Sequence, residues 1–144
     1  MCIQVLRGKL LPRYKNMIEV IRNDYKDFLN EYDFTQEYVE SVLELPTTDD
    51  RGTDYVLELR ESPIDGRGLF AIKAINEGEY IAMARVNGER MIAGRYTNHS
   101  PTPNAIFVHD GSGDLSMIAS QAIVVGEEVT VNYRQAGEVN GVIR

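Results

Sequence analysis

Ten residues, Arg-Tyr-Thr-Asn-His-Ser-Pro-Thr-Pro-Asn at positions 95 to 104, decide how the rest of this chain is organised. They are too polar and too rich in proline for a helix or a central strand. Pro101 and Pro103 each remove a backbone donor and push the preceding residue out of the α region. Apolar runs stand on both sides, at residues 91–93 and 105–108. We therefore expect a polar loop between two core strands, and such loops often carry binding chemistry.

The sequence around this segment alternates between short apolar runs and turn residues. Asn87-Gly88 lies between two such runs and predicts a type I′ hairpin, because both positions of that turn need a positive φ. The glycine-rich segment 110–114 predicts a second hairpin loop. Strands are expected at residues 55–60, 79–84, 106–109, 115–119, 122–125 and 128–133. Many short strands with regular turns indicate an all-β body.

The first third of the chain has a different pattern. Apolar residues recur at steps of three and four from residue 14 to residue 29, which predicts an amphipathic helix. A second helix is expected from Gln36 to about Leu45, capped by Thr35 or Asp33 and ended before Pro46. The polar segment 47–54 is the best candidate boundary. We therefore expect a helical extension at 1–54 and a β domain at 55–144, a mostly β fold with N-terminal helices (α+β).

Composition restricts the class of protein. A chain of 144 residues predicts one domain, and its net charge of −7 argues against nucleic acid, whose phosphates require cations. An acidic surface favours a basic partner such as a lysine-bearing segment, although it also serves simple solubility. The single cysteine, Cys2, excludes a disulfide framework or a cysteine cluster for zinc. Without a long apolar run or a signal-peptide layout, we expect a cytoplasmic protein that does not bind membranes.

Residues 66–71 read Gly-x-Gly-x-x-Ala, a pattern that occurs in dinucleotide-binding folds. That interpretation needs a helix to begin at the motif inside a βαβ unit, and no such unit can be drawn here. The plain structural interpretation is a tight turn in which Gly66 and Gly68 both take positive φ. In the functional interpretation the missing side chains allow the backbone to approach a ligand, and Arg67 pairs with a ligand carboxylate.

Asn98, His99 and Tyr133 are the other candidate site residues. Asn98-His99-Ser100 is formally a glycosylation sequon, but nothing in the sequence points to secretion. A metal site at His99 is not expected, because one other histidine and one distant cysteine offer too few ligands. A structural histidine, a turn-capping asparagine and a packed tyrosine at the end of strand 128–133 are the plain alternatives.

Three segments in this order resemble SET-domain protein-lysine methyltransferases: the glycine turn at 65–71, the Asn-His-Ser loop at 95–104 and the closing segment at 126–133. The resemblance extends from about residue 55 to residue 133. It implies a β-clip of short strands with a threaded, knot-like C-terminal segment. It also implies S-adenosylmethionine as cofactor and a lysine-bearing protein or peptide as substrate. One departure is Pro101, where many members have a zinc-binding cysteine.

The family resemblance also implies residue roles. The turn formed by Gly66, Arg67 and Gly68 would cradle the methionine end of the cofactor. Asn98 and His99 would hold its adenine and amino ends. Tyr133 would lie beside the sulfonium methyl and orient the lysine amine. A small single-domain member of this kind suits a bacterium or a phage-infected host.

Two elements that close the site in other members are shortened here. About 26 residues separate Ala71 from Asn98, too few for the usual groove wall, and only 11 residues without an aromatic follow Tyr133. We expect the N-terminal helices, or a second copy of the chain in a homodimer, to cover the cofactor instead. The rival interpretation is a SET-like binding module without turnover. A third is methylation of a small amine, which a shortened groove would admit.

Overall fold

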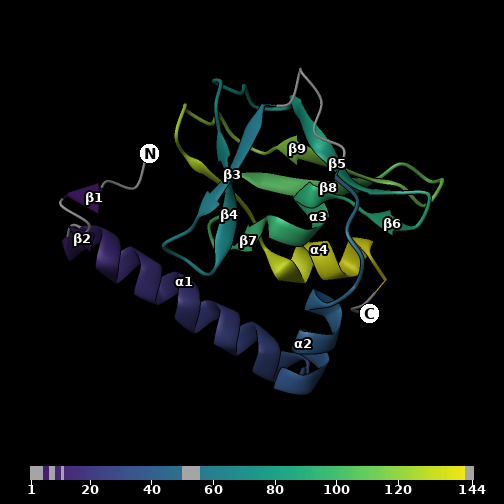
Figure 1. Cartoon of the computed structure of the whole chain (residues 1–144), viewed down its shortest axis with the longest axis horizontal. Coiled ribbons are helices and arrows are strands. Elements are labelled where there is room, and N and C mark those ends of the chain that lie inside the picture. The colour runs from purple at the N-terminus through teal and green to yellow at the C-terminus, as the bar shows by residue number, and fades with distance from the viewer. Residues whose placement is uncertain (1–4, 7–8, 11, 50–55, 142–144) are drawn as a thin grey trace.

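The computed structural model describes residues 5–6, 9–10, 12–49 and 56–141 (Figure 1). Cys2 and the expected domain boundary at 54/55 lie outside the described residues. The elements are β1 (Val5–Leu6), β2 (Lys9–Leu10), α1 (Pro12–Glu31), α2 (Gln36–Leu43), β3 (Leu57–Glu61), β4 (Arg67–Ala71), β5 (Tyr80–Val86), β6 (Glu89–Arg90), α3 (Ile92–Tyr96), β7 (Asn98–His99), β8 (Ala105–His109), β9 (Leu115–Ala119), β10 (Glu128–Val131) and α4 (Tyr133–Val139).

Two four-stranded sheets form the body of the molecule. One has the order β3-β4-β10-β7 and the other the order β6-β5-β9-β8, while β1 and β2 pair separately. Among the named strands of the described residues, every pair is antiparallel except β10 with β7, which is parallel. The expected α+β class with N-terminal helices is confirmed. The knot-like threading of the C-terminal segment stays a prediction.

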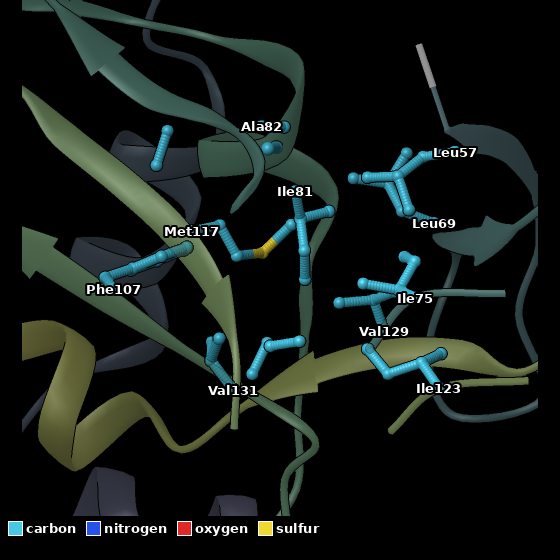
Figure 2. Close-up of a cluster of buried hydrophobic side chains, with 14 of the residues drawn as sticks. Leu57, Leu69, Ile75, Ile81, Ala82, Phe107, Met117, Ile123, Val129 and Val131 are labelled. Atoms are coloured by element: carbon cyan, nitrogen blue, oxygen red, sulfur yellow. The ribbon is translucent and has the colours of Figure 1, made fainter. Parts of the chain in front are cut away.

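Apolar side chains of both sheets form one core. Leu69, Met117, Val129 and Val131 are fully buried in it, and Figure 2 shows them among their neighbours. In β9 every second residue is buried, as a strand with one face in the core requires. In β10 all four residues are buried, because this strand lies between β4 and β7 and is also covered on both faces.

The expected N-terminal helix is confirmed and is longer than predicted, from Pro12 to Glu31. Ile18 and Ile21 of α1 pack against Ile64, just before the glycine turn. The Arg22 guanidinium fixes the same place, donating to the carbonyl oxygens of Ile64 at 2.8 Å and Pro63 at 2.7 Å. In Figure 1 this long helix runs below the sheet that carries β4 and β7.

The second helix begins where predicted, and its cap is Thr35 rather than Asp33. The Thr35 hydroxyl accepts the N–H of Tyr38 at 3.1 Å, whereas Asp33 takes a left-handed φ of 55° in the connection before it. The helix ends at Leu43, two residues earlier than expected. None of its residues is buried, so the apolar stripe of α2 contributes nothing to the core.

Both hairpin predictions are confirmed. Asn87 and Gly88 have φ values of 52° and 79° and connect β5 to β6. Residues 110–114 connect β8 to β9, with full register from Ala105–Ala119 to His109–Leu115. Local turn chemistry is sufficient here, because the positive φ that these turns need is available to few residue types.

Three local predictions were wrong. Residues 122–125 are not a strand, since only Ile123 makes an isolated bridge, to Ile75, and Val124 and Val125 are exposed. Residues 91–93 lead into the short helix α3 rather than forming a core strand. Tyr133 does not end a strand: Asn132 accepts the N–H of Arg134 at 3.0 Å and caps α4, of which Tyr133 is the first residue. Apolar runs of four residues or fewer do not distinguish these states.

Among the helices that the structure describes, none has the length and apolar character to cross a bilayer.

Candidate active site

The side-chain amide of Asn98 ties the glycine turn to β10. Its Nδ2 donates to the carbonyl oxygen of Asp65 at 3.1 Å and to Glu128 Oε2 at 2.8 Å, and it lies 3.4 Å from the carbonyl oxygen of Arg67. Ser62 completes the cluster by donating to both Glu128 oxygens, at 2.7 and 2.9 Å. The amide nitrogen of Asn98 is therefore engaged in hydrogen bonds that hold the glycine turn against β10.

Positions 66 and 68 of the turn require glycine for different reasons. Gly66 has a φ of 47°, as expected, but Gly68 does not take a positive φ, and that part of the prediction was wrong. A Cβ on Gly68 would lie 2.2 Å from Glu128 Oε2 and 3.0 Å from Asn98 Nδ2. Gly68 thus provides space for the Glu128 carboxylate. Burial raises the pKa of Glu128, and the hydrogen bonds from Asn98 and Ser62 oppose that rise.

His99 connects α1 to the first residue of α4. Its Nδ1 accepts the backbone N–H of Tyr133 at 3.0 Å, and its Nε2 lies 2.7 Å from Asp24 Oδ2. Because an N–H can only donate, Nδ1 must be unprotonated, and the proton of the neutral ring is on Nε2. Burial lowers the pKa of His99 although the Asp24 carboxylate raises it, so the ring is neutral near pH 7.

The main chain of His99 faces outward. β7 is the outer strand of its sheet, and the N–H of Ser100 donates to the carbonyl oxygen of Val131 at 2.9 Å. Successive residues of a strand direct their N–H and C=O groups to opposite sides, so those of His99 point away from β10. The N–H and the C=O of His99, one donor and one acceptor, are therefore directed out of the open edge of this sheet, away from β10 and β4.

The phenol of Tyr133 lies beside the His99 imidazole and is held there by a hydrogen bond. Its hydroxyl donates to the carbonyl oxygen of Thr97 at 2.9 Å, and its ring centroid lies 5.1 Å from that of His99. Burial raises the pKa of Tyr133 well above its ordinary value of 10.0, so the hydroxyl keeps its proton at neutral pH. Such a group can orient a neighbouring amine through hydrogen bonding, but it is a poor general base.

Helix α1 covers these residues. The rings of Tyr25 and Phe28 lie 5.8 and 5.9 Å from the ring of Tyr133, and Phe28 also stacks on His99 with centroids 6.1 Å apart. The Asp24 carboxylate pairs with Arg134 at 2.9 Å. We expected the N-terminal helices, or a second copy of the chain, to cover the cofactor. Helix α1 lies over the candidate site residues, and its contact with a cofactor stays a prediction.

The structure thus places Gly68 and Asn98 together around the Glu128 carboxylate, and it joins the next residue, His99, to Tyr133 by a hydrogen bond. Arg67 is the outlying member, since its side chain is exposed and its guanidinium lies 5.8 Å from the ring centre of Tyr96. Across residues 12–49 and 56–141, no group of three or more His, Cys, Asp or Glu side chains is arranged to hold a metal ion.

Sequence reasoning missed several residues of this site: Asp24, Tyr25, Phe28, Glu128 and Arg134. Glu128 lay inside a quoted motif, and its position among buried strand residues was a signal that it needs partners. The α1 residues gave no such signal. They belong to a helix 75 residues away from His99 in the sequence, and helical periodicity does not say which surface the helix covers.

Residues 82–134 match the SET domain. The resemblance drawn from the three motifs is thereby confirmed over this span, which contains Asn98, His99 and Tyr133 and begins after the glycine turn. No curated protein sequence matches this chain.

Several solved structures are similar to a part of this chain. A Plasmodium falciparum protein, whose name assigns it provisionally to the histone methyltransferases, shares 18% identity at a TM-score of 0.47, covering 56% of this chain and 94% of that one. A humanized Chaetomium thermophilum Polycomb Repressive Complex 2 shares 21% identity at a TM-score of 0.45 over 54% of this chain. An autoinhibited form of that complex, bound to S-adenosylmethionine, shares 21% at 0.47 over 58%. This chain spans 14% and 16% of the two Polycomb chains.

Proposed function

We propose that this protein is a methyltransferase that uses S-adenosylmethionine to methylate the ε-amine of a lysine in a protein or peptide. The observation that carries the proposal is the hydrogen-bonded connection between the glycine turn, the Asn98–His99 pair and Tyr133. Three segments far apart in the sequence meet at one place, in the order and with the residue types of a SET domain. The family match over residues 82–134 supports the same conclusion.

The residues present fit such a cofactor. The outward N–H and C=O of His99 offer a donor and an acceptor for an adenine edge, while the Asn98 and His99 side chains hold the surrounding backbone. The aromatic rings of Tyr25, Phe28 and Tyr133 suit a sulfonium cation, because ring faces attract positive charge. The exposed Arg67 would meet the cofactor carboxylate.

Bound S-adenosylmethionine supplies an electrophilic methyl group, and the site must hold the ε-amine of the substrate lysine neutral and aligned with that methyl group. A free lysine with a pKa near 10.4 is neutral in roughly 1 of 2500 molecules at pH 7. A site that excludes water and holds a nearby positive charge lowers that pKa. Tyr133 keeps its proton and donates it to the Thr97 carbonyl oxygen, so its hydroxyl oxygen is left to accept a hydrogen bond from the amine and position it. The net charge of −7 favours a basic substrate segment.

The rival is a binding module of the same scaffold without turnover. The observation in its favour is the packing of α1 directly on His99 and Tyr133, since the same contact that would enclose a cofactor could also exclude it.

Calorimetry with S-adenosylmethionine and with its demethylated product separates these functions. The proposal expects saturable heat with both ligands, followed by methyl-lysine detected by mass spectrometry after incubation with labelled cofactor and lysate proteins. Binding without any transfer would favour the module. An absence of binding to either ligand would refute the cofactor assignment itself.

A further inference from the structure

We infer that Asp24 of α1 is a positioning residue of this site, and that it acts through His99 on the placement of Tyr133. The inference rests on the proposed function for its consequence in catalysis. Its structural part, a fixed tautomer of His99 and a fixed Tyr133 backbone, stands independently. A residue of the N-terminal helix, outside the matched span 82–134, would then belong to the working site.

The chemistry of the groups determines the direction of each hydrogen bond between Asp24, His99 and Tyr133. The Tyr133 N–H can only donate, so His99 Nδ1 accepts and His99 Nε2 carries the proton. The Asp24 carboxylate can only accept, and its Oδ2 lies 2.7 Å from Nε2. Asp24 therefore selects the one tautomer of His99 that can hold the Tyr133 backbone. The Tyr133 hydroxyl then reaches the Thr97 carbonyl oxygen at 2.9 Å.

Water is a poor replacement for Asp24 in this position. The His99 side chain is only 2% exposed, whereas that of Asp24 is 23% exposed. Phe28 stacks on the imidazole and the ring of Tyr25 lies 6.2 Å from its centroid, so both rings help to enclose the His99 side chain. Arg134 Nη1 donates to the same Asp24 oxygen, Oδ2, at 2.9 Å. The carboxylate is thus fixed between the residue it orients and the residue that follows Tyr133.

The docking of α1 does not depend on Asp24 alone. Ile18 and Ile21 pack on Ile64, and Arg22 binds the backbone carbonyls of Pro63 and Ile64. Removing the Asp24 charge should therefore leave the helix in place and change the orientation of His99. A helix that stays docked while His99 changes its orientation would distinguish a positioning role of Asp24 from a merely structural one.

Glu31 provides a matched control. It is a second α1 carboxylate that pairs with Arg134, at 2.9 Å, whereas Asp24 pairs with Arg134 and also reaches His99. Asp24→Asn and Glu31→Gln each remove one negative charge beside Arg134. In Asp24→Asn the amide can also turn its NH₂ toward Nε2, which favours the other tautomer and places Nδ1–H against the Tyr133 N–H.

Nuclear magnetic resonance tests the structural part in the full-length chain without any ligand. The protein has two histidines, so the exposed His109 serves as an internal reference. In wild type and Glu31→Gln, the His99 ring should carry its proton on Nε2 and the Tyr133 amide should be protected from exchange. In Asp24→Asn both features should be lost. A wild-type proton on Nδ1, or equal responses of the two variants, would overturn the inference, and the wild-type measurement needs no variant to fold.

Kinetics test the consequence for methyl transfer. Asp24→Asn should lower kcat by about 10- to 100-fold, by analogy with the loss of a carboxylate that orients a metal-ligating histidine, with a smaller change in KM for the cofactor. Glu31→Gln should stay within about twofold of wild type. An unchanged kcat in Asp24→Asn would overturn the positioning role. A wild-type protein that binds no cofactor would instead refute the proposed function, and the imidazole spectrum would still decide the role of Asp24.

Discussion

Replacing Gly68 with alanine tests the arrangement that joins the glycine turn to β10. The new methyl carbon would lie 2.2 Å from Glu128 Oε2, 2.9 Å from Glu128 Cδ and 3.0 Å from Asn98 Nδ2. Ordinary contacts begin near 3.5 Å, so the carboxylate would have to move by about 1 Å. It is buried and held by Ser62 at 2.7 and 2.9 Å and by Asn98 at 2.8 Å.

The expected loss of stability follows from those contacts. Overpacking a filled interior costs about 1 to 3 kcal/mol. Weakening one hydrogen bond to a charged group costs about 1.5 to 3 kcal/mol. We therefore expect Gly68→Ala to lower the free energy of unfolding by about 3 kcal/mol. Gly66→Ala is the control, because a Cβ there meets nothing within 4 Å and only the left-handed φ of 47° opposes it. That conformation costs about 1 to 2 kcal/mol.

Urea unfolding followed by circular dichroism measures both values, and calorimetry measures cofactor affinity. Gly68→Ala should lose more stability than Gly66→Ala. In a Glu128→Ala background, where the obstructing carboxylate is gone, the same Gly68→Ala change should cost less than about 1 kcal/mol. An equal cost in both backgrounds would show that the space at Gly68 is not kept for Glu128.

Two further predictions address Tyr133 and His99. Tyr133→Phe should still bind S-adenosylmethionine but lose most turnover, since it removes only the hydroxyl that is fixed to the Thr97 carbonyl; undiminished methyl transfer, measured with labelled cofactor, would contradict its role. The pKa of His99 lies below its usual 6.5 because of burial, so the unfolded chain binds the proton more readily and the free energy of unfolding should fall as pH is lowered below about 6.5. The pKa of Glu128 is raised, so its contribution to the free energy of unfolding falls as pH rises above 4.5, opposite to that of His99. Glu128 is present in both wild type and His99→Gln. The difference between their urea curves at pH 7.5 and 5.5 therefore isolates His99.

The sequence by itself determined most local structure. Alternating apolar residues and the Asn87-Gly88 turn predicted the β5–β6 and β8–β9 hairpins, because side-chain period and positive φ are local properties. Apolar residues at steps of three and four predicted α1, and Thr35 supplied a cap for α2. The order of three motifs predicted the family that residues 82–134 match. Where local signals were short, at 91–93, at 122–125 and at Tyr133, the prediction failed.

Only the tertiary structure decided which groups meet. It showed that Gly68 leaves room for Glu128, that the Asn98 and His99 side chains support the backbone, and that Asp24 reaches His99 across 75 residues of sequence. An amphipathic pattern specifies that one face of α1 is buried but not what it is buried against. That choice depends on the summed fit of side chains and hydrogen bonds between distant segments, and it places an N-terminal helix on the site that the motifs define.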